Sequence, residues 1–132
     1  MIVDTSLLIA LDQGNDAARR TVRKYETGGT PLRVPTAVLM ELYISVGLGQ
    51  TPAKNAESLE ALVKHHPIID LDANIARKAG TLLGLHRDSD TKPDLGAFDA
   101  AVTATGLVFA EPVVTGDCSD FETIDGLQVV SW

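Results

Sequence analysis

Residues 1–10 read MIVDTSLLIA and combine a short apolar run with a single carboxylate, Asp4. The pair Ile2-Val3 is typical of a buried strand and Leu7 begins a helical pattern, so Asp4 stands where the strand ends. Burying a charge costs free energy unless the charge has a partner, so a carboxylate at this place needs a physical reason. The same order recurs at residues 111–117, EPVVTGD, where a second apolar run leads to Asp117.

Short apolar runs and helical patterns alternate along the rest of the chain. Strands are expected at 2–3, 32–34, 67–71, 111–117 and 127–132, and helices at 7–11, 16–26, 36–49, 55–64, 72–87 and 98–109. This alternation favours a parallel sheet covered by helices on both faces, and such sheets bind ligands at the carboxyl ends of their strands. We therefore predict an α/β fold with a central, mainly parallel sheet of about five strands. One domain is expected to span residues 1–132.

The composition limits the class of protein and its compartment. Of the 132 residues 45% are hydrophobic, which excludes a disordered chain, and the formal net charge at pH 7 is -7. A protein that coats nucleic acid would be basic, but an enzyme with an acidic site can still act on nucleic acid. The one cysteine, Cys118, cannot form a disulfide within the chain. Because no signal peptide or apolar run of roughly 20 residues is present, we expect a cytoplasmic protein that does not bind membranes.

Four acids stand beside apolar segments. Asp4 and Asp117 each follow a strand, so they are expected to share one rim of the parallel sheet. Glu41 lies in TAVLMELYISV (36–46), a segment that is apolar nearly all round and is therefore predicted to be a buried helix. A lone glutamate in such a helix needs a partner. Asp99 opens the helix FDAAVTATGL, where the helix dipole favours an anion.

These acids together indicate a metal site. Carboxylates that are brought together repel one another, and a hard divalent cation with oxygen ligands, Mg²⁺ or Mn²⁺, relieves that conflict. Such an ion activates water and stabilises charge on a phosphoryl oxygen. Each acid also has a purely structural interpretation. In these interpretations, Asp4 would cap a helix and Glu41 would pair with an arginine. Asp99 would be an ordinary acid of a first helical turn, and Asp117 would belong to a turn.

These segments resemble PIN-domain ribonucleases, and among them the short toxins of VapC-type toxin–antitoxin pairs. The resemblance rests on IVDTSLLIAL, VPTAVLMELY, LDANIARKAGTLLG, FDAAVTATGL, VVTGDCSDFETIDGLQVV and the terminal Trp132, which follow in this order over nearly the whole chain. It implies a three-layer α/β/α fold and hydrolytic cleavage of RNA. It also implies one or two Mg²⁺ or Mn²⁺ ions held by four acids, a small cognate antitoxin, and a homodimer.

The resemblance assigns roles to particular residues. Three of the four acids match Asp4, Glu41 and Asp99 directly. The fourth is Asp117 or Asp120, and we expect Asp117 because it is the first acid after the strand. Three hydroxyl side chains are expected to orient the carboxylates or their waters, or in the case of Ser6 to cap a helix. They are Thr5, Ser6 and Thr115.

One position departs from the family pattern. Many relatives carry an arginine between the threonine and the acid of the last motif, where this chain has Gly116. Contacts with RNA are therefore expected from Arg87 or Lys92, in the region before Asp99. Arg19 and Arg23 lie on the basic face of a predicted helix, which is either a solvated surface or a contact for RNA phosphates or an acidic partner.

The function expected from these observations is that of a metal-dependent endoribonuclease, the toxin of a type II pair that inhibits translation. Two alternatives stay open: a PIN nuclease that processes RNA without being a toxin, and a PIN module that binds without catalysis. A haloacid-dehalogenase-like phosphatase would need a second aspartate two residues after Asp4, where this chain has Ser6.

Overall fold

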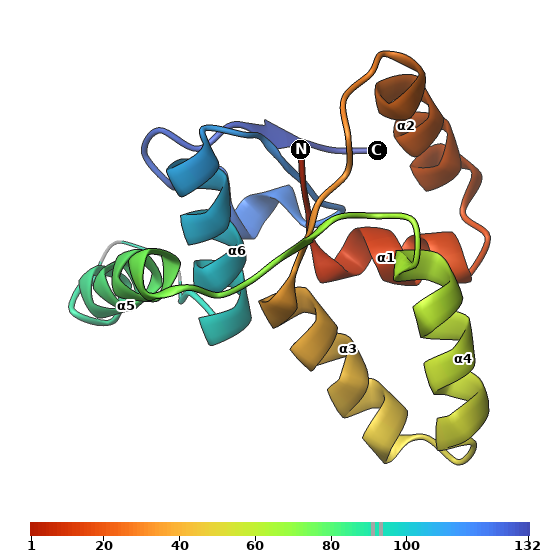
Figure 1. Cartoon of the computed structure of the whole chain (residues 1–132). Coiled ribbons are helices and arrows are strands. Elements are labelled where there is room, and N and C mark those ends of the chain that lie inside the picture. Colours follow the sequence, from red (N-terminus) through yellow and green to blue (C-terminus); the bar gives the residue numbers. More distant parts are fainter. Residues whose placement is uncertain (91, 93) are drawn as a thin grey trace.

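The computed structural model describes residues 1–90, 92 and 94–132 (Figure 1). These residues form six α-helices and five short strands. In chain order they are β1 (Ile2–Val3), α1 (Thr5–Asp12), α2 (Asp16–Thr27), β2 (Val34–Pro35), α3 (Thr36–Leu48), α4 (Pro52–Val63), β3 (Ile68–Ile69), α5 (Ala73–Arg87), α6 (Ala97–Phe109), β4 (Val113–Val114) and β5 (Val129–Val130). A 3-10 turn, η1 (Cys118–Asp120), follows β4. No helix among the described residues is both long and apolar enough to cross a membrane.

The strands are parallel and form two small sheets. One has the order β1-β4-β5 and the other pairs β2 with β3. A single parallel bridge between Ile2 and Arg33 joins the two sheets, so the strands follow the order β3-β2-β1-β4-β5. The prediction of an α/β fold with about five mainly parallel strands is confirmed. Because the strands are parallel, the residues that follow β1 and β4 lie at the same rim.

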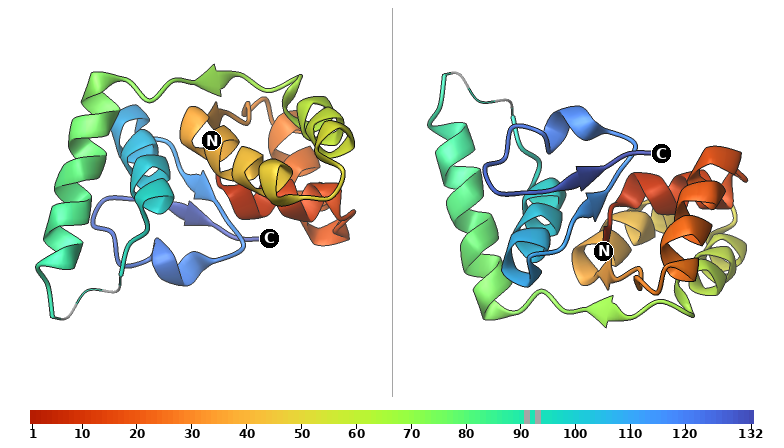
Figure 2. Two further views of the ribbon diagram at one scale, coloured as in Figure 1. Left: turned by 90° about the horizontal axis from the view of Figure 1, so that it is seen from below. Right: turned by 90° about the horizontal axis from the view of Figure 1, so that it is seen from above.

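Helices cover both sides of the strands. Figure 2 shows α5 and α6 on one side and α1, α2, α3 and α4 on the other. The first hydrophobic cluster joins the strands to α1, α3 and α4 and includes Leu7, Val38 and Leu59. The second lies between α5 and α6 and includes Ile75 and Ala104. The candidate site therefore lies on a rim between two packed layers.

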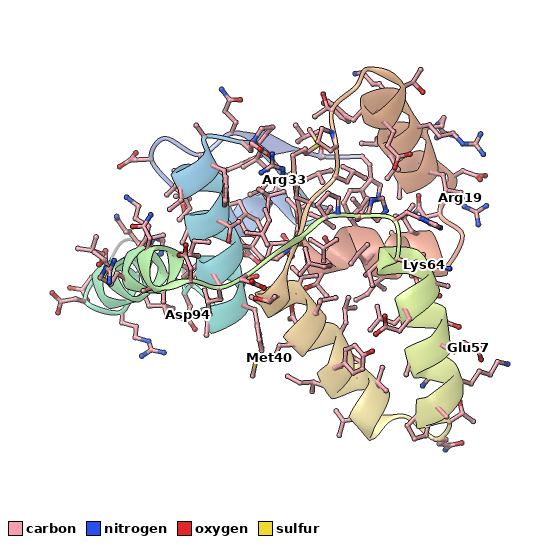
Figure 3. The ribbon with its side chains drawn as sticks, in the orientation of Figure 1. Arg19, Arg33, Met40, Glu57, Lys64 and Asp94 are labelled. Carbon is pink, nitrogen blue, oxygen red and sulfur yellow. The ribbon has the colours of Figure 1, made fainter. Side chains whose placement is uncertain are left out.

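Helix α3 is less buried than its sequence predicts. Ala37, Val38 and Leu42 face the core, as expected for one side of the helix. Met40 and Leu48, in contrast, are 63% and 83% exposed, and Met40 projects away from the molecule in Figure 3. The prediction of a fully buried helix is therefore wrong, because an all-round apolar pattern here combines a core face with an exposed apolar face.

Several helix boundaries also differ from the predicted ranges. Helix α3 begins at Thr36, as predicted, and ends at Leu48, one residue before the predicted end. Helix α4 begins at Pro52 instead of residue 55, because proline is well suited to the first turn of a helix. The N-cap of α5 is Asp72, whose carboxylate accepts a hydrogen bond of 2.8 Å from the backbone N–H of Ile75.

Candidate functional site

Asp4 is held by two hydroxyl groups from different parts of the chain. Its side chain is buried, and it makes no capping hydrogen bond to α1 although Asp4 occupies the N-cap position. Instead, Oδ2 accepts hydrogen bonds from Ser6 Oγ at 2.7 Å and from Thr115 Oγ1 at 2.8 Å. Both protons go to Oδ2, so Oδ1 is the oxygen that these hydroxyls leave available. The structure therefore does not support the interpretation of Asp4 as a simple helix cap.

The backbone that leaves β4 fixes these two hydroxyls. The N–H of Gly116 donates to Ser6 Oγ at 3.0 Å, and the N–H of Asp117 donates to Thr115 Oγ1 at 3.0 Å. The ring of Trp132 lies against Gly116, since a Cβ atom built on Gly116 would be 2.7 Å from the ring. Ser6 and Thr115 therefore join the exit of β4 to Asp4, which agrees with the orienting role expected for them.

Glu41 finds its partner in a hydroxyl group and not in an arginine. It is half-buried on α3, and its Oε2 accepts a short hydrogen bond from Thr5 Oγ1. Thr5 is the first residue of α1, directly after Asp4. The hydrogen bond thus joins α3, which carries Glu41, to the first residue of α1, which follows Asp4.

Asp99 lies among the other acids. It is half-buried in the first turn of α6, and its carboxylate accepts a hydrogen bond from the backbone N–H of Gly96. Burial, followed by the negative charges of Asp4, Glu41 and Asp120, raises the pKa of Asp99 to about 6. These charges act on Asp99 because the four carboxylates share one region of the rim. The region is therefore crowded with like charge.

The burial of Asp99, together with this crowding, has a measurable cost that an asparagine at position 99 would remove. The pKa of Asp99 is above its ordinary value of 3.8, so the folded state holds the proton more tightly and stability falls as the pH rises through about 4 to 6. The shift corresponds to at most ~3 kcal/mol, and partial exposure reduces this to about 1 kcal/mol. In a chelator, Asp99→Asn should unfold at a higher denaturant concentration than the unchanged chain at pH 7.5, with little difference at pH 4. An equal difference at both pH values would contradict this explanation.

Asp120, and not the expected Asp117, is the acid of this loop whose charge reaches Asp99. Asp117 is exposed, and its Oδ1 accepts a hydrogen bond of 2.7 Å from Ser119 Oγ. Asp120 is half-buried at the end of η1 and is one of the three charges that raise the pKa of Asp99. The 3-10 turn therefore favours Asp120 as the fourth acid, in place of the preferred Asp117.

In the part of the chain that the structure describes, no cationic side chain forms an ion pair with this group of acids. The ion pairs found among the described residues both involve Glu111, with the amino group of Met1 and with Arg33. Arg33 also lies over the ring of Phe109, 5.4 Å from its centroid. Arg33 therefore serves another part of the molecule. The charge of the acids is left for a bound cation to balance.

The four cationic side chains that the sequence analysis proposed as contacts for RNA or a partner are all exposed. Arg87 ends α5, and Lys92 lies in the segment that leads from α5 to α6, the helix whose first turn carries Asp99. Arg19 and Arg23 lie on α2, which follows the carboxyl end of α1, whereas Asp4 precedes the amino end of α1. Figure 3 shows Arg19 at the outer edge of the molecule. Of the four, Arg87 and Lys92 are nearest to Asp99 along the chain.

The donor set fits a hard divalent cation. Asp4, Glu41, Asp99 and Asp120 offer only carboxylate oxygens, which Mg²⁺ and Mn²⁺ prefer, and the uncompensated charge favours a cation. Within the described residues, no three acidic, histidine or cysteine side chains converge closely enough to hold one ion. Three of the four acids instead have a donor of their own nearby: the hydroxyls at Asp4 and Glu41 and the Gly96 N–H at Asp99.

An α/β fold with parallel strands that end beside a group of acids defines a recognisable class of protein. The model of the PIN domain family matches residues 1–127, and the chain therefore belongs to this family. The resemblance predicted from the sequence is confirmed. The proteins that the chain is similar to include VapC toxins and their complexes with antitoxins.

Three relatives illustrate the similarity. The tRNA(fMet)-specific endonuclease VapC of Shigella flexneri is 24% identical over 132 residues, which cover 99% of this chain and 96% of the relative. The structure of VapBC2 from Rickettsia felis bound to a promoter DNA fragment has a TM-score of 0.86 at 18% identity, over 99% of this chain and 97% of that one. VapC20 of Mycobacterium tuberculosis, a sarcin-ricin loop cleaving toxin, has a TM-score of 0.67 at 16% identity, over 90% and 91%.

Proposed function

We propose that this chain is a Mg²⁺- or Mn²⁺-dependent endoribonuclease, the toxin of a type II toxin–antitoxin pair that inhibits translation in the cytoplasm. The observation that carries the proposal is the group of acids at the rim of the sheet, whose charges act on Asp99 and for which residues 1–90, 92 and 94–132 provide no ion pair. Membership of the PIN-domain family supports the same chemistry.

The roles of the residues follow from their hydrogen bonds. A bound divalent ion would supply an acidified water and stabilise charge on the phosphoryl oxygens. Asp4 would bind the ion through Oδ1, because Ser6 and Thr115 occupy Oδ2. Asp99 and Asp120 would complete the carboxylate set. Glu41 would accept the proton of the attacking water through Oε1, because Thr5 donates to Oε2.

RNA is the proposed substrate class. One relative is named as a tRNA(fMet)-specific endonuclease, and another is described as cleaving the sarcin-ricin loop. The two names specify different RNA targets, so they support RNA in general and no particular molecule. Arg87 and Lys92, exposed in the approach to Asp99, are the proposed phosphate contacts. Arg19 and Arg23 are proposed to meet RNA or the partner further from the acids.

The test of this function is cleavage of total cellular RNA by the purified chain, freed of any antitoxin. Reactions with Mg²⁺, with Mn²⁺ and with a chelator are compared by electrophoresis and end sequencing. Discrete fragments that require the metal are expected. Intact RNA in every reaction, from protein shown to be folded, would contradict the proposal and favour a PIN module that binds without catalysis.

A small antitoxin is the proposed protein partner. Similar solved structures are VapBC complexes, including one from nontypeable Haemophilus influenzae. This chain has a hollow of about 300 Å³ between α1, α3 and α4, lined in part by Leu8, Leu42 and Leu62. An apolar segment of a partner would find a complementary surface there.

A homodimer through α3 is the proposed assembly, and it gives a further prediction. Met40, Ile44 and Leu48 are spaced four residues apart and form one exposed apolar strip, which a second copy would cover. Ile44→Glu should convert the dimer to a monomer in size-exclusion chromatography with light scattering. Leu71→Glu is the matched control, because Leu71 is 49% exposed, close to the 47% of Ile44, and lies outside α3. A dimer that survives Ile44→Glu would place the interface elsewhere.

A further inference from the structure

We propose that Gly96 is a positioning residue for Asp99: the absence of a side chain at the N-cap of α6 leaves room for the place that this carboxylate takes beside the other acids. The ion-binding part of this inference rests on the proposed function. Gly96 itself belongs to none of the acid motifs in the sequence.

The backbone of Gly96 does not require a glycine. Its φ of −67° and ψ of 155° lie in the extended region that any residue adopts. Gly96 is also exposed, so the core leaves room for a side chain there. The obstacle is local: a Cβ atom at this position would overlap Asp99 Oδ2 and lie 3.5 Å from Asp99 Cγ. The position of the Asp99 carboxylate therefore accounts for the absence of a side chain at residue 96.

The N-terminus of α6 has no capping side chain at its N-cap. Ser, Thr, Asp and Asn are favoured at N-cap positions because their side chains accept hydrogen bonds from the first turn, and glycine is also common there. Gly96 offers no such side chain. Instead Asp99, the third residue of the helix, accepts the hydrogen bond of the Gly96 N–H, which is one half of a capping box. A single carboxylate thus caps the helix and belongs to the acid group.

Because Asp99 both caps the helix and belongs to the acid group, a substitution at Gly96 can affect helix stability and ion binding in opposite directions. Serine is a slightly better N-cap than glycine, so Gly96→Ser should suit the helix. Its Cβ atom would nevertheless force the Asp99 carboxylate out of its present place. The substitution that helix capping alone would favour is therefore expected to damage the site, which a merely structural role for Gly96 does not predict.

The first experiment measures Mn²⁺ binding to the full chain by isothermal titration calorimetry. Gly96→Ser and Gly96→Ala are expected to weaken binding at least 10-fold, the scale seen when a group that orients a ligand is removed. Gly80→Ala on α5 is the matched control, because a Cβ atom there meets nothing within 4 Å. Circular dichroism checks the fold of each variant. Binding by Gly96→Ser within twofold of the unchanged chain would overturn the inference.

The second experiment needs no ion and measures thermal unfolding in a chelator. Gly96→Ser should change the Tm by different amounts with Asp99 present and in an Asp99→Ala background, because the obstructed carboxylate is then gone. An equal effect in both backgrounds would show that Gly96 does not act through Asp99. If the unchanged chain bound no Mn²⁺, the proposed function would fail, whereas this comparison would still decide the role of Gly96.

Discussion

Asp4→Asn should lower RNA cleavage by the purified chain roughly 100- to 1,000-fold, the loss typical of removing one preorganised electrostatic contact. Asp4 is 6% exposed, and its carboxylate is held in place by two hydroxyls, one of them at the exit of β4. Asparagine has nearly the same volume, and its amide oxygen accepts the same two protons. The fold should therefore persist while the negative charge at Oδ1 disappears.

The measurement compares initial rates of cleavage for the unchanged chain, Asp4→Asn and a control. Asp125→Asn is a suitable control, because it removes an exposed carboxylate from the turn before β5. Mn²⁺ affinity should fall in parallel with the rate for Asp4→Asn and stay constant for Asp125→Asn. Cleavage by Asp4→Asn at the unchanged rate would show that the nuclease activity, if present, does not use this acid group.

Asp120→Asn should lower the cleavage rate about 100-fold, whereas Asp117→Asn should lower it less than threefold. Asp120 is half-buried and its charge acts on Asp99, whereas Asp117 is exposed and bonded to Ser119. One missing carboxylate in an ion-binding group is expected to cost on the order of 100-fold in activity or metal affinity. The backbone N–H of Asp117, which holds Thr115, remains in either variant.

The two variants are each other's control, because they make the same chemical change three residues apart in one loop. Rates at saturating and at low Mn²⁺ separate a loss of metal affinity from a loss of turnover. A strong defect for Asp117→Asn with a weak one for Asp120→Asn would restore the assignment expected from the sequence. Equal defects would indicate that both acids contribute to the ion site.

The sequence predicted the parallel fold and three of the four proposed acids because each has a local signature. An acid that ends an apolar run, as Asp4 does, or opens a helix, as Asp99 does, is placed at a rim by the fold class alone. The fourth acid has no such signature. Asp117 is closer to the strand, but the turn at Cys118–Asp120 brings Asp120 toward Asp99. That turn depends on contacts that the sequence does not display.

Other features of the site involve groups that have no sequence pattern. The N–H groups of Gly96, Gly116 and Asp117 act through the backbone, so their residue types give no sign of the role. The exposure of α3 was also not predictable from periodicity, because an apolar face for the core and an apolar face for a partner look alike in a sequence. Glu41 was correctly expected to need a partner, but the hydroxyl of Thr5 took the place of the arginine considered.

The contact between Trp132 and Gly116 provides a spectroscopic probe. The chain contains one tryptophan, so all of its indole emission originates at this place. The ring touches Gly116, whose N–H holds Ser6, which in turn holds Asp4. A rearrangement of Asp4 should therefore change the environment of the fluorophore. Titrations of the unlabelled protein, followed at a single emission wavelength, would report events at the acids in real time.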